Sequence, residues 1–489
     1  MFPPLDDVYR VAPELVLCAF GILVMLAEPF VPRERRGGLG TVALLGAVLA
    51  LVATRFVATH PGTAFYGLIL TDRFSIFLHL MIGAVAVLVV LGSRDYLERE
   101  GLQHGEYYAL VLFAAAGMEV MASAQELMTA FIGLEMSSIS SYILASFRRS
   151  APKANESAMK YFLLGSFATA FFLYGVAMVY GATGTTKLDA LREAITAGNA
   201  GGALLTLGFG MMFVGLAFKV ATAPFQIWTP DVYEGAPTPV TALLSSAPKA
   251  AAFALLLRIL YVAFDSSGNR WLWVIWISAA LTMFVGNLAA LVQTNLKRML
   301  AYSSIAHAGY ILVAVAAVSV ANEDGRNEFG IAAVLFYLAA YALMKLGAFT
   351  MVTHLGGTGE RRLEISDYAG LGTEQPAAAA CLTLYLLSLL GLPVTAGFLG
   401  KLYVFDAALK SHLVWLAVLL AINSVIGAYY YLRVVVVMYM REPQQQWAPA
   451  PIPRALGLVL LLTAAGTIYL GLFPGAVMGF AARSALSLR

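Results

Sequence analysis

The sequence predicts an all-α polytopic membrane protein of about fourteen transmembrane helices, with two inverted five-helix repeats that contain broken helices. Of its 489 residues, 60% are hydrophobic and only 12% are charged, whereas soluble globular proteins carry about 25% charged residues. This is more apolar surface than a water-facing fold can bury. Apolar runs of about 20 residues follow one another along the whole chain, which is the length a helix needs to cross a bilayer.

The candidate spans are separated by short polar loops. We predict them at residues 11–32, 38–59, 74–93, 107–124, 126–147, 157–182, 202–226, 239–264, 271–292, 297–320, 329–354, 376–409, 412–440 and 454–477. The first span contains Glu14 and Glu28 and lacks a small-residue cleavage site, so we expect a retained helix and not a signal peptide. The segment 186–198 is short and amphipathic, which favours a position at a membrane surface.

Basic residues orient the predicted bundle. Most of them lie in one alternate set of loops: Arg33, Arg35, Arg36, Arg94, Arg99, Arg148, Arg149, Lys153, Arg361, Arg362, Arg441 and Arg454. The other set holds fewer: Lys187, Arg192, Arg270 and Arg326. Because cytoplasmic loops carry the excess of lysine and arginine, both termini are predicted to face away from the cytoplasm.

Composition and motifs exclude several function classes. The only cysteines, Cys18 and Cys381, are too few for a disulfide framework, a cysteine zinc site or an iron–sulfur cluster. The net charge of +3 is spread among loops, so nucleic acid is not an expected partner. The glycine-containing string GATGTTK (181–187) lacks the spacing of a phosphate-binding loop. We therefore expect no cofactor and no metal on this chain.

Ionisable residues inside the apolar spans are the candidate functional residues. They are Glu119, Glu135, Lys160, Lys219, Lys249, His307, Lys345 and Lys401. A lysine at the centre of a membrane helix costs about 2.5–3.5 kcal/mol on insertion scales, and such residues commonly mark ion or proton pathways.

Three of these lysines lie near a proline. Lys219 precedes Pro224, Lys249 directly follows Pro248, and Lys401 comes after Pro393. Proline removes a backbone donor and frees a carbonyl, and in lipid such groups must be satisfied by protein or water. We therefore predict small hydrated pockets where broken helices meet these lysines.

Glu135 is the predicted partner of Lys219. If this pair tightens and loosens, the lysine can take up and release a proton. One charge crossing about 150 mV costs roughly 3.5 kcal/mol, and a pKa change of about 2.5 units is worth the same free energy. The free-energy change available from one such pair thus matches the free energy needed to move one proton.

Structural roles are the alternatives for the same residues. Lys219 and Glu135 could form a purely structural ion pair, and His307 could be a satisfied core histidine. Lys160 lies near the start of its span and could reach the membrane surface. Glu119 and Lys345 could form a private structural pair or face a cavity.

Two similar strings indicate an internal repeat. SSISSYILASF (137–147) resembles SSIAHAGYILVAV (303–315), and the strings fall in the fifth and tenth predicted spans. An offset of five spans inverts the second copy relative to the first. Inverted repeats with broken helices place transport sites near the bilayer midplane.

The longest motifs resemble a known family. FKVATAPFQIWTPDVYEGAPTPVTALLSSAPKAA (218–251) is similar to the signature of the antiporter-like membrane subunits of respiratory complex I, a NADH-quinone oxidoreductase, and more distantly to Mrp-type antiporters. Within the family, WTPDVYEGAPTPV and the lysine of GLPVTAGFLGKLYVF (391–405) are most similar to the subunit N branch. The resemblance extends over nearly the whole chain.

The resemblance implies fourteen helices in four parts. These are an N-terminal three-helix segment (1–105), a first antiporter-like repeat of helices 4–8 (106–265), a second of helices 9–13 (266–441) and a C-terminal helix (442–489). It implies breaks in helices seven and twelve. It also implies proton transfer by Glu135, Lys219, Lys249 and Lys401, with Lys160 and His307 beside that path. Glu119, Lys345 and Gln226 depart from the family pattern; we add Glu119 and Lys345 to the auxiliary path.

The predicted function is proton translocation by a membrane-arm subunit of such a complex, in a bacterial inner membrane. Flavin, iron–sulfur clusters and quinone are expected in partner subunits, and the partners are other membrane subunits and lipid. One alternative is a standalone or Mrp-type cation/proton antiporter. Another is a structural spacer that braces the membrane arm.

Overall fold

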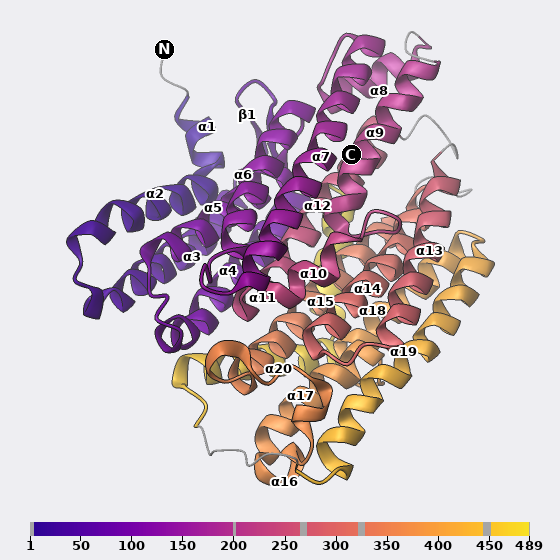
Figure 1. The fold of residues 1–489 in the computed structure, drawn as a ribbon. Coiled ribbons are helices and arrows are strands. Elements are labelled where there is room, and N and C mark those ends of the chain that lie inside the picture. The colour runs from indigo at the N-terminus through magenta and orange to yellow at the C-terminus, as the bar shows by residue number, and fades with distance from the viewer. Residues whose placement is uncertain (1–3, 199–201, 265–270, 321–327, 444–450, 489) are drawn as a thin grey trace.

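The computed structural model describes residues 4–198, 202–264, 271–320, 328–443 and 451–488, and long helices dominate it (Figure 1). The membrane-length helices are α2 (Ala12–Ala27), α3 (Gly37–Val57), α4 (Arg73–Arg99), α5 (Gly105–Ser123), α6 (Leu127–Ala145), α7 (Pro152–Thr183), α9 (Ala203–Val220), α13 (Leu272–Leu291), α14 (Leu296–Val318), α15 (Glu328–Leu355), α19 (Val414–Met440) and α20 (Arg454–Leu472). The predicted all-α membrane class is confirmed.

Twelve helical stretches of the described residues are long and apolar enough to cross a membrane. One of them, Thr238–Ala263, is built from α11 (Thr238–Ser245), α12 (Ala247–Arg258) and a π-helical turn (Ile259–Ala263). The other two predicted spans correspond to α5, which carries Glu119, and to a helix interrupted in its middle. The count of fourteen therefore stays a prediction.

Two spans are broken at their centres. α9 ends at Val220, Ala221 adopts a left-handed conformation (φ 62°), and the short helix α10 begins at Trp228 and ends at Gly235. In the later span, α17 (Pro376–Leu390) is followed by Gly391 at φ 94°, and the chain resumes as α18 (Ala396–Lys410). These are the seventh and twelfth predicted spans, so the expected breaks are present.

Helices α12, α14 and α15 form the centre of the molecule. The span that contains α12 is entirely buried, and most of α14 and α15 is buried too. By contrast, α7 presents most of its surface outward, as a lipid-facing helix does. Polar side chains on the three central helices are therefore shielded on all sides by protein.

The two five-helix sets pack in the same order. In the first set α5 packs on α6 and α7 on α9; in the second, α13 packs on α14 and α15 on α18. The N-terminal helices α2, α3 and α4 lie against α5 at one side of the bundle (Figure 1). The last helices, α20 and α21 (Gly475–Ala485), pack on α4 and α15.

The first and last segments of the described chain both lie near the start of α4. Asp7, near the N-terminus, accepts a hydrogen bond from the backbone of Phe65 in the hairpin of β1 (Gly62–Ala64) and β2 (Ile69–Thr71). Near the C-terminus, the hydroxyl of Ser487 accepts one from the backbone of Phe74 in the first turn of α4. Near the same hairpin, α8 (Leu188–Thr196) is the short amphipathic helix predicted at 186–198, and Lys187 before it donates to the Tyr66 carbonyl.

Candidate functional site

Lys219 lies at the break between α9 and α10, in the last turn of α9. Its ammonium group is buried and donates to the hydroxyl of Ser138 on α6, at 2.8 Å. Glu135 lies one turn before Ser138 on the same helix and acts on Lys219 electrostatically. Among the described residues, however, no ion pair of 4.0 Å or less joins Glu135 to Lys219. Lys219 is thus held by a serine hydroxyl one turn from its predicted partner and interacts with Glu135 only electrostatically.

The backbone groups freed at this break are met by protein. The indole of Trp228 donates to the carbonyl of Phe218, and the hydroxyl of Thr282 on α13 accepts from the amide of Ala223. A membrane-buried chain can leave helical geometry only where such partners exist. The break therefore holds Lys219 in place without opening the backbone to lipid.

Lys249 lies just after the kink at Ser246 that separates α11 from α12. Its Nζ donates to both the carbonyl (2.9 Å) and the hydroxyl (2.6 Å) of Ser304 on α14. The hydroxyl of Tyr341 on α15 donates to the same serine oxygen at 2.6 Å. Three central helices are thus joined by one serine.

His307 is the centre of a second set of hydrogen bonds. Its Nδ1 lies 2.7 Å from the hydroxyl of Tyr337, and its Nε2 lies 3.1 Å from the hydroxyl of Tyr431 on α19. Tyr431 in turn bonds the hydroxyl of Ser303, which also accepts from Lys345 Nζ at 2.9 Å. This is an unbroken chain from Lys345 to Tyr337 through His307.

Lys401 lies on α18, just beyond the second break. Its Nζ donates to the carbonyl of Leu390, the last residue of α17, at 2.7 Å. The same ammonium lies over the ring of Tyr310, 4.9 Å from its centroid, in a cation–π geometry. A lysine bound to a carbonyl freed by a broken helix is the arrangement that the proline and glycine positions predict.

The charges of these groups are interdependent. Lys249, Lys345 and Lys401 each act electrostatically on His307, and all four side chains are buried. No acidic residue in the described ranges forms an ion pair with any of the three lysines. Like charges close together in a low-dielectric interior repel strongly. Adding a proton to one of these groups therefore disfavours protonation of the others.

Lys160 belongs to a different, partly exposed network. It pairs with Glu156 and with Asp231 on α10, both at 2.8 Å. Arg298 at the start of α14 bonds the same Asp231 at 2.7 Å and Glu234 at 3.0 Å. Burial raises the pKa of Asp231, but the Lys160 and Arg298 hydrogen bonds outweigh it and hold that pKa below its ordinary value. Lys160 thus links α7 to α10 by an ion pair at the surface of the bundle.

Glu119 and Lys345 are not brought together. Glu119 on α5 lies beside Glu14 and His79, on the N-terminal helices. Lys345 on α15 instead donates to Ser303 and to the carbonyl of Leu300 on α14. A private pair of Glu119 with Lys345, one of the alternatives considered, is not what the structure contains.

Hydroxyl groups are the participants that sequence reasoning missed. Ser138 and Ser304, which accept from Lys219 and Lys249, are each the second serine of the repeated string Ser-Ser-Ile. The repeat is visible in the sequence, but the string itself indicates only a similarity between two spans and not a hydrogen bond to a lysine. The linking tyrosines, by contrast, give no signal that distinguishes them from core aromatic residues.

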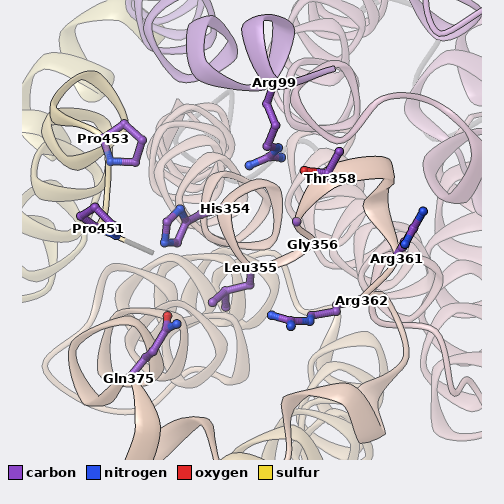
Figure 2. Close-up of a pocket in the computed structure, with 11 residues that line it drawn as sticks. Arg99, His354, Leu355, Gly356, Thr358, Arg361, Arg362, Gln375, Pro451 and Pro453 are labelled. Atoms are coloured by element: carbon purple, nitrogen blue, oxygen red, sulfur yellow. The ribbon is translucent and has the colours of Figure 1, made fainter. Parts of the chain in front are cut away.

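A surface cavity of about 400 Å³ lies apart from these residues (Figure 2). Arg99, His354, Arg361 and Arg362 point toward it from α4, the end of α15 and the loop that follows. None of the eight predicted site residues lines it. The candidate site is therefore the buried chain across the central helices and not this basic cavity.

Comparison with known proteins gives consistent matches. The family described as NADH:quinone oxidoreductase/Mrp antiporter, transmembrane, matches residues 124–427. NADH-quinone oxidoreductase subunit N 1 of Solibacter usitatus is 49% identical over 485 residues, covering 99% of this chain and 98% of the relative. The subunit N of Trichlorobacter lovleyi is 44% identical over 476 residues, covering 96% and 95%.

Solved structures agree with these matches. A chain of respiratory complex I from Thermus thermophilus with bound aureothin superposes with a TM-score of 0.80 at 36% identity, covering 96% of this chain and 99% of that one. A chain of the Mrp complex from Dietzia sp. gives a TM-score of 0.85 at 21% identity, covering 98% and 97%. The second similarity is one of fold.

Proposed function

Because this chain belongs to the NADH-quinone oxidoreductase subunit N family, we propose that its buried lysines, histidine and hydroxyl groups carry the protons that the complex translocates. The chain is a proton-translocating membrane subunit of a multi-subunit respiratory complex. What remains to be assigned is how its own residues do this.

The observation that carries the proposal is the acid-free cluster around His307. Lys249, Lys345 and Lys401 each act electrostatically on one buried imidazole, and the hydroxyls of Ser303 and Tyr431 connect Lys345 to it. A purely structural lysine is normally paired with a carboxylate, because an unpaired buried charge is costly. A set of basic groups that repel one another and lack a carboxylate partner is instead suited to transferring protons from one member to the next.

We propose that protons enter from the cytoplasm toward Lys219 and Glu135, pass Lys249 and leave by way of Lys401. Each transfer moves a proton from an ammonium to a neighbouring neutral amine or imidazole, through a hydroxyl or a water that donates one proton as it accepts another. His307 and Lys345 join the two halves of this path. Lys160 is the auxiliary residue at the surface, since Asp231 and Glu156 hold it beside α10.

The free energy for this movement comes from quinone reduction in partner subunits. We propose that this chain carries no redox centre, and that flavin, iron–sulfur clusters and quinone belong to other subunits. The driving signal would reach it as a change in charge or position near Glu135. A carboxylate that approaches Lys219 favours its protonated state, and one that withdraws releases the proton inward.

We further propose the four-part division at 1–105, 106–265, 266–441 and 442–489, and a multi-pass position in the bacterial inner membrane. Two contacts support the orientation. Arg148 and Arg99, from the basic set of loops, reach the carbonyls of Gly359 and Thr353, so these loops meet at one face. We propose that Asp7 and Ser487, which contact the hairpin and the first turn of α4, lie on the non-cytoplasmic side, away from the basic loops.

Inside-out membrane vesicles test this proposal against its rivals. NADH should acidify wild-type vesicles, and Lys219→Ala or Glu135→Ala should reduce that acidification by roughly tenfold or more, as expected for loss of a proton-transfer group. Unchanged acidification in both variants would favour a structural spacer. A sodium or potassium gradient imposed without NADH should move no protons; proton movement sensitive to Lys219→Ala would favour an antiporter.

A further inference from the structure

A buried cluster lies outside the lysine path, in the N-terminal three-helix segment. It consists of Glu14 on α2, His79 on α4 and Glu119 on α5, whose ligand-type atoms all lie within 4.8 Å of one another. The exposed fractions are 5%, 2% and 1%, so water reaches none of the three freely. Gly83, one turn after His79, also lies beside Glu119: a Cβ built there would lie 3.9 Å from Oε1.

The two carboxyl groups of this cluster are unusual in having no cationic partner. All four of their oxygens lack a hydrogen bond, and in the described part of the chain no lysine or arginine pairs with either. Ser123 lies beside them, but its hydroxyl donates to the backbone carbonyl of Glu119. His79 Nε2 lies 3.1 Å from that same carbonyl and 3.7 Å from Glu14 Oε1.

The hydrogen-bond pattern places one proton on the histidine ring, and burial disfavours a second, charged state. A carbonyl can only accept, so Nε2 carries the proton that it donates to Glu119, and Nδ1 has no partner. A neutral imidazole leaves both carboxyl groups without a compensating charge. Two carboxylates this close in a buried site cannot both be ionised.

We propose that Glu14, His79 and Glu119 form a proton-binding site, in which at least one of the two carboxyl groups holds a proton at neutral pH. The proton comes from water and returns to water at the face where α2 and α4 begin, and one O–H bond forms as a hydronium or water O–H bond breaks. No oxidant or metal is involved. This site adds to the proposed lysine path and lies off it.

Arg258 connects the site to the helix that carries Lys249. It lies on α12 and forms an ion pair of 2.9 Å with Asp72, the N-cap residue of α4. It also donates a hydrogen bond of 2.7 Å to the carbonyl of Ala122. It also acts electrostatically on His79. A movement of α12 that shifts Arg258 would therefore change how tightly the site holds its proton.

The groups that face the cluster come from every neighbouring helix. On α2, Cys18 lies one turn after Glu14 and interacts with both carboxyl groups. On α4 and α12 the charged groups are Asp72 and Arg258, which neutralise each other. The charged side chains around the cluster thus sum to a net charge close to zero. The negative charge of Glu14 and Glu119 must therefore be reduced by protonation of these carboxyl groups themselves.

Infrared spectroscopy of the purified complex tests the proposal without turnover. At neutral pH the wild type should show the carbonyl-stretch band of a protonated carboxylic acid. The double variant Glu14→Gln/Glu119→Gln should lack this band. Each single variant should retain a shifted band, because the remaining carboxyl group is still buried without a cation. Glu126→Gln is the matched control: Glu126 accepts from both the amide and the hydroxyl of Thr129 and should leave the band unchanged.

Two results would overturn the proposal. One is identical spectra for the wild type, both single variants and the double variant. The other is a stoichiometric metal ion in the purified wild-type complex that His79→Ala and the double variant both lose, which would make the cluster a metal site. Neither result depends on pumping through Lys219, so failure here is distinguishable from failure of the proposed function.

Discussion

At the scale of single residues, the buried lysines are held by neutral oxygens. Lys219 and Lys249 donate to serines, and Lys401 donates to the carbonyl freed at a helix break. Such partners accept from an ammonium and from a neutral amine alike, because a neutral amine still has N–H groups to donate. A carboxylate would instead favour the charged form strongly. Neutral partners therefore allow the lysines to change protonation state.

Replacing Ser138 by alanine tests this point at Lys219. The variant removes the acceptor at 2.8 Å and leaves the ammonium unsatisfied, which costs about 1–3 kcal/mol. Proton pumping should fall by roughly fivefold or more. Ser141→Ala is the matched control, since Ser141 is buried on the same helix and bonds only the carbonyl of Ser137. Equal pumping in the two variants would contradict the role given to Ser138.

The hydroxyl of Tyr431 is the link between Ser303 and His307. Tyr431→Phe keeps the ring and removes only that hydroxyl, so packing is preserved while the chain from Lys345 is cut. We expect slower NADH-driven acidification of vesicles with unchanged assembly of the complex. Tyr430→Phe removes a neighbouring buried hydroxyl that bonds Asn287 and should pump like the wild type.

At the scale of helices, the second break depends on Gly391. Its φ of 94° is strained for any other residue, and an added Cβ would lie 3.2 Å from Lys401 Cδ. Gly391→Ala should therefore lower the stability of the complex by about 1–2 kcal/mol and reduce pumping. Gly210→Ala, on helical backbone in open space, should do neither. Thermal unfolding of the purified complexes compares the two, and equal midpoints would argue against strain at Gly391.

Glu360 joins a loop to two helices and makes that junction pH-dependent. It accepts from the amide and hydroxyl of Thr238 on α11 and from Lys297 on α14 at 2.8, 2.7 and 3.0 Å. Burial raises the pKa of Glu360, but the Lys297 charge and the Thr238 hydrogen bonds outweigh it and hold the pKa below its ordinary value. The stabilisation is complete above the unfolded pKa, about 4.3, and is lost as pH falls through the folded value.

Glu360→Gln therefore has a predictable pH profile. At neutral pH it should destabilise the junction by about 1.5–3 kcal/mol, the range for hydrogen bonds to a charged group. Below about pH 4 the difference from the wild type should shrink, because the wild-type carboxylate becomes protonated too. Unfolding midpoints measured across this range provide the comparison, with Glu374→Gln as a control for loss of one acidic side chain. A constant difference at all pH values would contradict the account.

At the scale of the whole molecule, the sequence predicted the class, the two breaks and the lysines beside them. Proline and glycine positions carry that information locally, as at Pro224 and Gly391. The hydrogen bond from Lys219 to Ser138 was not predictable, because it depends on which faces of α6 and α9 meet. The cluster of Glu14, His79 and Glu119 was missed for the same reason, since three helices must pack before its members become neighbours.

The arrangement of the whole bundle places every step of the path where water is scarce. Lys219 and Lys401 lie at breaks in two outer spans, whereas Lys249 and His307 lie on the central helices α12 and α14. Charge repulsion acts over such distances only in a low-dielectric interior. The cluster around His307 thus lies within the electrostatic reach of Lys401 at the second break and of Lys249 on α12.

Proton movement by the reconstituted complex with Lys249→Met tests the central claim most directly. Met fills the space of the lysine stem and cannot carry a proton, and Lys410→Met, at an exposed residue paired with Asp406, is the control. We predict that NADH oxidation with an artificial electron acceptor persists in both variants, while NADH-driven proton uptake into liposomes falls by roughly tenfold or more only in Lys249→Met. If the Lys249→Met complex took up protons at the wild-type rate, the claim that the buried lysines carry the protons would be contradicted.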